Sequence, residues 1–280
     1  MMKTCDLHTH SVFSDGTYTP SEIIDGAILL GLSAVALTDH NTVDGVREFV
    51  EYAKDKDIEA IAGAEFSVDY NGRELHLLGL FIPESGFSKV TELMKEGNER
   101  KEQSNIDLVN ALNNAGCDID YNEIKKATPN GKVNRAHIAA TLTEKGYTES
   151  IKQAFKELLS PSVGYYKEPQ RPTVWEMIDF ILEIGAIPVL AHPFLNLSSA
   201  ELEVFLPAAK ARGLVGMECY YSTYTPGEVE LSITIAKRFD LKLSGGSDFH
   251  GLNKPDIKLG TGRGDLKVPY ALVGELVKKA

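Results

Sequence analysis

The sequence predicts an α/β fold in which about seven short strands alternate with amphipathic helices around a parallel sheet or barrel. Three observations lead to this prediction. Apolar runs of strand length alternate with helix-like stretches on both flanks of the chain, whereas residues 87–158 are almost entirely helical in character and contain no convincing strand. Nearly all histidines stand where an apolar run ends. The chain has 280 residues, enough to bury a substantial core.

The elements follow one another in a regular order. A first strand ends at His8, and Thr19-Pro20-Ser21-Glu22 predicts a helix with Thr19 as N-cap and Glu22 completing a capping box; this helix is expected to end near Gly31. Further strands are expected at 34–40, 58–68, 74–81, 187–192, 215–220 and 241–248. Further helices are expected at 43–56, 174–184, 199–212, 228–239 and 270–279. We therefore predict a barrel domain from residues 1–84 and 171–280, interrupted by a helical subdomain at 85–170.

Composition and charge exclude several classes of protein. The net charge of -11 opposes tight binding of long duplex nucleic acid, which depends on basic side chains. Cys5, Cys117 and Cys219 are widely spaced and form no CxxC pair, which argues against a disulfide framework or a thiolate zinc site. No early apolar segment has the length of a signal peptide or a membrane span. We expect a cytoplasmic protein without a membrane partner; its oligomeric state is not predicted.

The candidate site residues lie at predicted strand ends, the edge at which α/β barrels gather catalytic groups. They are His8, His10, His40, Glu65, His76, His192, Asp248 and His250. One histidine in such a place is more often a hydrogen-bonded core residue than a ligand. Six of the seven histidines of the chain stand there, which favours a metal site.

The spacing of the first two histidines supports this interpretation. His8 and His10 are two residues apart on an extended segment, so their side chains leave the same face and can reach one ion. Glu65 and Asp248 add carboxylates, and such mixed ligands suit zinc, manganese or iron rather than magnesium alone. Asp15 can return to the site from the following loop, or its Asp-Gly sequence can simply form a turn.

The segments DLHTHSVFSDG, TDHNTVDG, GAEFS with the later LHLLG, LAHP and SDFH resemble the successive motifs of the PHP (polymerase and histidinol phosphatase) family. This resemblance implies a distorted (β/α)7, TIM-like barrel with two or three divalent metal ions, whose identity as manganese, iron or zinc stays open. It implies that one ion is held by His8, His10, Glu65 and Asp248, a second by Glu65, His76 and His192, and a third by Asp15, His40 and His250.

All nine positions carry the expected residue types, which predicts an active hydrolase of phosphoric ester bonds. In this hypothesis a metal-bridging hydroxide, held by Glu65, Asp248 and His192, attacks phosphorus while the cations neutralise the leaving oxygen. The expected substrate is a small phosphomonoester. The best candidates are a nucleoside 3′,5′-bisphosphate and a short 5′-phosphorylated oligonucleotide, because the chain resembles in layout a PHP subfamily with a helical insertion that acts on them.

Three residues are predicted to contact substrate. Arg135 and His137 stand beside a predicted helix start in the insertion, where they can bind phosphate or form an ordinary exposed turn. In the subfamily that the layout resembles, the insertion caps the site and supplies an Arg and a His to phosphate. Tyr221, one of a group with Tyr220 and Tyr224, can stack on a base, although burial in the core is the more common role.

Three alternative functions remain open at this point. A histidinol-phosphate phosphatase would share the metal motifs. A non-catalytic, metal-binding regulatory module is disfavoured by the complete ligand set. An amidohydrolase would have similar barrel-end ligands, but the sequence lacks a plausible carbamylated lysine at a strand end.

Overall fold

The computed structural model describes residues 3–128 and 131–278, so residue 279 of the last expected helix lies outside the described residues. The chain divides into two compact units, Met1–Thr91 with Arg171–Ala280, and Glu92–Gln170. Helix α3 (Phe87–Asn114) runs from the first unit into the second. The boundary in this part of the chain therefore lies inside a helix, a few residues after the predicted position at residue 85.

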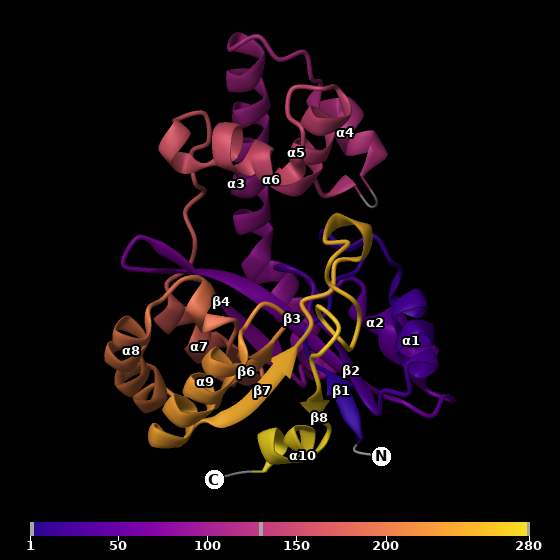
Figure 1. The fold of residues 1–280 in the computed structure, drawn as a ribbon, viewed down its shortest axis with the longest axis vertical. Helices are drawn as coiled ribbons and strands as arrows, with labels where there is room; N and C mark the ends of the chain where they lie inside the picture. The colour runs from indigo at the N-terminus through magenta and orange to yellow at the C-terminus, as the bar shows by residue number, and fades with distance from the viewer. Residues whose placement is uncertain (1–2, 129–130, 279–280) are drawn as a thin grey trace. The chain divides into compact units, whose positions relative to one another are not determined.

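The first unit is built on one sheet, which has eight strands in the described residues (Figure 1). They are β1 (Thr4–Asp6), β2 (Ala34–Leu37), β3 (Glu59–Tyr70), β4 (Arg73–Leu80), β5 (Ile187–Leu190), β6 (Gly216–Tyr221), β7 (Lys242–Gly246) and β8 (Val268–Pro269). Their order is β7-β6-β5-β4-β3-β2-β1-β8. Strand β4 pairs antiparallel with both β3 and β5, whereas β1, β2 and β3 pair in parallel, as do β5, β6 and β7.

The sheet curves round until β7 meets β1. The Leu7 amide donates to the Gly245 carbonyl at 3.1 Å, and the Asp248 amide donates to the His8 carbonyl at 2.8 Å. A Cβ atom at Gly246 would lie 2.4 Å from the Cβ of His8, so only glycine allows this approach. The predicted distorted barrel is confirmed; the antiparallel β4 distorts it, and the two-residue β8 on the far side of β1 was not predicted.

Helices cover the barrel strands on the outside, and most begin where the sequence places a cap. Helices α1 (Pro20–Leu29) and α2 (Val46–Ala53) pack on β2 and β3, and α7 (Val174–Glu183) packs on β3, β4 and β5. The remaining helices of this unit are α8 (Ser199–Ala211), α9 (Pro226–Arg238) and α10 (Ala271–Val277). The predicted capping box of Thr19 and Glu22 is present, and α7, α8 and α9 each begin with a box of the same kind.

The second unit consists of helices in its described residues. They are the main part of α3, then α4 (Tyr121–Ala127), α5 (Arg135–Glu144), α6 (Ile151–Ala154) and a π-helical turn at Phe155–Leu159. Leu108, Leu112, Ile138 and Leu142 lie at the centre of its own buried apolar cluster. No helix among the described residues of the chain has the length and apolar character needed to cross a bilayer.

Candidate metal centre

The predicted ligands converge where the barrel strands end, with one difference from the sequence prediction. His8 and His10 follow β1, His40 follows β2, His192 follows β5, and Asp248 with His250 follows β7. Glu65 and His76, expected at strand ends, instead lie inside β3 and β4. These two strands continue past the barrel as a hairpin, so both side chains still reach the ligand cluster at the rim.

Glu65 lies at the centre of the cluster and is fully buried. Its Oε1 is 2.8 Å from Nδ1 of His76 and 2.9 Å from Nε2 of His192. Its Oε2 is 3.0 Å from Nδ1 of His40 and 3.3 Å from Nε2 of both His8 and His10. One carboxylate thus faces imidazoles from four other segments of the barrel, which is the position of a bridging ligand.

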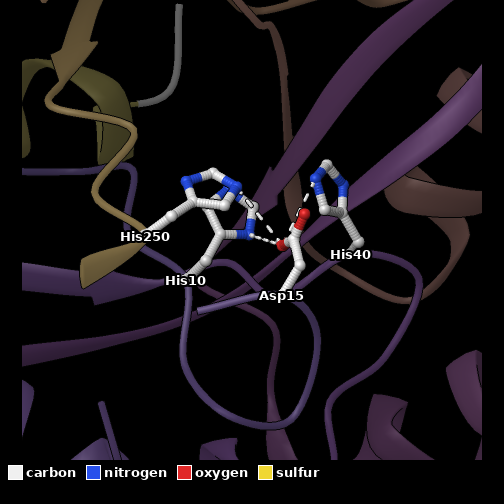
Figure 2. Close-up of side chains that lie close together, drawn as sticks. All are labelled: His10, Asp15, His40 and His250. Atoms are coloured by element: carbon white, nitrogen blue, oxygen red, sulfur yellow. Dashed lines mark ion pairs between the residues drawn. The ribbon is translucent and has the colours of Figure 1, made fainter. Parts of the chain in front are cut away.

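The sequence left open whether Asp15 reaches the site or only forms a turn. In the structure, its side chain lies in the cluster, on the loop after β1. Figure 2 shows its carboxylate among His10, His40 and His250. Asp15 Oδ1 lies 3.2 Å from Nε2 of His250 and 3.8 Å from both Nε2 of His40 and Nδ1 of His10. Asp248 Oδ1 lies 3.2 Å from Nε2 of His10, 3.4 Å from Nδ1 of His250 and 3.6 Å from Nε2 of His8.

The donor set fits divalent cations. Three groups bring possible ligand atoms within 4.8 Å of one another: His10, Asp15, His40 and His250; His8, His10 and Glu65; and His40, Glu65 and His76. Within the described residues, the buried atoms His40 Nδ1 and Glu65 Oε2 lie 3.0 Å apart but form no hydrogen bond with each other or with any other group. Because such atoms are costly to bury unpaired, a cation between them would remove a real penalty. Mixed imidazole and carboxylate ligands suit zinc, manganese or iron.

The carboxylates of the cluster are held in their charged form. Burial acts to raise the pKa of Glu65, but His76 and His8 outweigh it and hold that pKa well below its usual range. The pKa of Asp248 is also lowered, since Lys254 and His250 outweigh its burial. The pKa of the partly buried Asp15 is likewise held well below its usual range, so three negative charges converge on a small volume, as a cation site requires.

The imidazoles respond in two opposite ways. Burial acts to lower the pKa of His10, but Asp248 and Glu65 raise it to about 9. Burial acts in the same way on His76, but Glu65 and Glu74 raise its pKa to about 10. Burial dominates at His40 and lowers its pKa to about 4. Without a cation, protons on some of these histidines balance the carboxylates, so cation binding must displace them.

Glu218, a residue that the sequence analysis did not single out, supports two of the predicted ligands. It is fully buried on β6, with Oε1 3.1 Å from Nδ1 of His8, and its Oε2 accepts the backbone N–H of His192 at 2.7 Å. Because a carboxylate can only accept, Nδ1 of His8 carries the proton and Nε2 is left facing Glu65. No histidine marks this strand in the sequence, so only the fold reveals the role.

Two other buried carboxylates fix the loops that carry ligands. Asp6 accepts the Ser247 amide and hydroxyl at 2.8 and 2.5 Å and the Gly260 amide at 2.8 Å. Asp39 accepts the amide and hydroxyl of Ser11 at 2.7 and 2.6 Å. Both aspartates precede a histidine in the sequence motifs, which is the signal that could have identified them.

Two predicted ligands have unusual backbone conformations. His192 has φ of 27° and Asp248 has φ of 56°, values that residues other than glycine rarely adopt. Such conformations typically cost about 1–3 kcal/mol and are concentrated at functional sites. Each residue lies two positions after the end of a strand, in a turn that directs its side chain toward the cluster.

A cavity of about 520 Å³ opens beside the ligands. Its lining includes His40, Glu65, Glu74, His76, His192, Asn196, Tyr221 and Asp248, and two cationic side chains, Arg73 and Lys254. Lys254 Nζ lies 2.7 Å from Asp248 Oδ2, and the Lys254 side chain is 43% exposed. Tyr221, predicted to contact substrate, lines this cavity and donates its hydroxyl to the same Asp248 oxygen at 2.7 Å.

The other predicted substrate contacts lie in the second unit. His137 forms a capping box with Asn134 at the start of α5, accepting the Asn134 amide on Nδ1 at 3.1 Å. The Arg135 guanidinium lies over the ring of Tyr166, 4.3 Å from its centroid. Both residues thus have contacts within their own unit, and their role in binding phosphate stays a prediction.

Comparisons with known proteins agree with the motifs. The PHP domain signature matches residues 6–172. The chain is 33% identical over 251 residues to a 5′-3′ exoribonuclease of Haemophilus influenzae, covering 89% of this chain and 91% of the relative. It is 29% identical over 254 residues to a 3′,5′-nucleoside bisphosphate phosphatase of Chromobacterium violaceum, covering 89% and 88%. A crystal structure from Bifidobacterium adolescentis, assigned as a metal-dependent phosphoesterase, superimposes with a TM-score of 0.86 at 28% identity, covering 98% of this chain and 96% of that one.

Proposed function

This chain belongs to the PHP domain family, and from that membership we propose that it is a metal-dependent phosphoesterase acting on small nucleotides. The observation that carries the proposal is the placement of Glu65. This one buried carboxylate contacts His8, His10, His40, His76 and His192 beside an open cavity. Burying so many polar groups around one carboxylate costs free energy, and a charged ligand bound between them would offset that cost.

We assign the ligands as the sequence motifs imply. His8, His10, Glu65 and Asp248 would hold one ion, Glu65 with His76 and His192 a second, and Asp15 with His40 and His250 a third. Manganese, iron and zinc all suit these ligands. Divalent cations bound there would supply positive charge to a phosphate and lower the pKa of a water molecule toward neutrality.

The protein's own residues would orient the substrate in this cavity. Lys254, whose side chain is partly exposed, lies in the cavity wall, where its ammonium can bind a phosphate oxygen. Tyr221 and Lys254 both bond Asp248 Oδ2, which leaves Oδ1 directed at His8 and His10. The cavity volume of about 520 Å³ suits a nucleotide rather than a duplex.

The substrate we propose is a nucleoside 3′,5′-bisphosphate or a short 5′-phosphorylated oligoribonucleotide. The names of the two relatives support this class, and so does the net charge of -11, which opposes binding of long duplexes. We further propose that the helical segment at 85–170 acts as a cap, with Arg135 and His137 binding phosphate. Their replacement by Ala would then raise KM for nucleotides.

Release of inorganic phosphate and of nucleotides by the manganese-reconstituted protein tests the proposal. The panel contains adenosine 3′,5′-bisphosphate, 5′-AMP, a 5′-phosphorylated oligoribonucleotide and histidinol phosphate, with 3′- and 5′-products separated. We expect turnover of the bisphosphate, the oligoribonucleotide or both. Turnover of histidinol phosphate alone would contradict the substrate class. Metal-loaded protein that is inert toward the whole panel would support a non-catalytic metal-binding module.

A further inference from the structure

A second cavity, of about 340 Å³, lies beside the first and also belongs to the barrel unit. It is formed by the end of the β3–β4 hairpin and by α8 with the segment before it. Its walls are the side chains of Tyr70, Asn71, Arg73, Leu197, Ala200, Glu201 and Val204. The lining is therefore mainly apolar with a small number of polar groups, which is typical of sites for organic ligands.

Arg73 lines both cavities and so stands at their boundary. Its Nη1 donates to the Asn196 carbonyl at 2.8 Å and lies 2.9 Å from Oε1 of Glu201. Among the described residues, the hydrogen bond and the ion pair of this side chain are both made by Nη1, and the side chain is 47% exposed. The guanidinium is thus fixed on one edge and open on the other, which is the arrangement that binds a phosphate with two parallel hydrogen bonds.

Large apolar side chains stand exposed around this boundary. Val204, in the wall of the second cavity, is 75% exposed, and Leu195, in the wall of the first, is 52% exposed. Tyr70 adds an aromatic ring, packed against Phe205 at 4.9 Å between centroids. Exposed apolar side chains next to the accessible Arg73 guanidinium are suited to a ligand in which aromatic bases alternate with phosphates.

We propose that the second cavity is a subsite for the second nucleotide of a single-stranded oligonucleotide whose 5′ end occupies the metal cavity. Its base would pack on Tyr70, Leu197 and Val204, and the phosphodiester between the two nucleotides would bind the open edge of Arg73. The inference rests on the proposed function and adds to it, since the subsite would give oligonucleotides an affinity that nucleoside bisphosphates lack.

The test compares two substrates in each variant, so that a general loss of activity cancels. The measured quantity is the ratio of KM for a 5′-phosphorylated triribonucleotide to KM for adenosine 3′,5′-bisphosphate, with manganese-loaded protein. The variants are Arg73→Gln and Val204→Asp. The matched controls are Arg238→Gln, which breaks a similar surface ion pair with Glu203 on α8, and Leu29→Asp, which adds the same charge at an exposed position on α1.

We expect the ratio to rise about tenfold in Val204→Asp, because only the oligonucleotide has a second base. In Arg73→Gln we expect KM to rise for both substrates, because the bisphosphate carries its 3′-phosphate where the oligonucleotide carries the phosphodiester. Both controls should leave both KM values unchanged. Fluorescence anisotropy with a labelled triribonucleotide and EDTA-treated protein should show the same loss of affinity without any turnover. An unchanged ratio and unchanged affinity in both variants, with full turnover of both substrates, would overturn the subsite and leave the proposed function standing. Absence of turnover of both substrates by the wild-type protein would instead contradict the proposed function.

Discussion

Replacing Glu218 with glutamine tests whether a residue that touches no substrate controls the metal centre. Each carboxylate oxygen of Glu218 accepts one buried hydrogen bond, from His8 Nδ1 at 3.1 Å and from the His192 amide at 2.7 Å. Glutamine keeps one accepting oxygen and places an NH₂ group where the other stood. One buried donor therefore loses its partner, which costs about 1–3 kcal/mol in the free energy of unfolding.

The effect on metal binding should exceed the effect on folding. Glu218 fixes the orientation of His8 and the backbone at His192, and loss of such a partner typically lowers metal affinity by about 10–100-fold. Competition with a chromophoric chelator measures the affinity for manganese and zinc, and denaturant titration of EDTA-treated protein measures stability. Glu228→Gln, at the exposed capping box of α9, controls for the chemistry of the substitution. Metal affinity within twofold of wild type, together with the expected loss of stability, would refute a role for Glu218 in positioning the ligands.

Three further predictions concern the cluster itself. His10→Ala should abolish metal binding and turnover while circular dichroism shows a folded protein; unchanged turnover at full metal loading would remove His10 from the ligands. Lys254→Met should raise KM for the nucleotide about tenfold or more, since one charge-assisted bond is lost, whereas Lys254→Arg should recover most of it. The pKa of His10 is raised to about 9 and that of His76 to about 10, so the stability they contribute is complete below pH 6.5 and lost as pH rises through those values. Denaturation midpoints of EDTA-treated protein should therefore fall between pH 7 and 10, and a rise would contradict this assignment of protons.

Local rules explain why much of the fold could be predicted. The capping box at Thr19 and Glu22 depends on residues three apart, and the shared face of His8 and His10 depends only on the alternation of an extended chain. The predicted histidines and carboxylates therefore meet in the structure as their positions after successive strands required. The reversed direction of β4 was not predicted, because strand propensity carries no information about direction.

The residues that were missed depend on contacts distant in sequence. Glu218 lies in a strand that reads as an ordinary apolar run, and its partners are 210 and 26 residues away. Lys254 and Arg73 stand in segments that look like solvated loop or hairpin, and only the folded chain places them at the cavity. Sequence patterns identify groups whose chemistry is rare, such as clustered histidines, more readily than common charged residues in special places.

The junction of β1 with β7 has a consequence for synthesis of the protein on the ribosome. Candidate ligands run from His8 to His250, and the Asp6 carboxylate that fixes the loop before Asp248 binds Ser247, 241 residues later in the chain. A nascent chain that lacks β7 would have an open sheet and an incomplete set of metal ligands. Because contacts between distant residues form late in folding, cations should be captured only after nearly the whole barrel has emerged. Only chains that contain β7 would then bind the cations, and truncated chains would remain without cations and inactive.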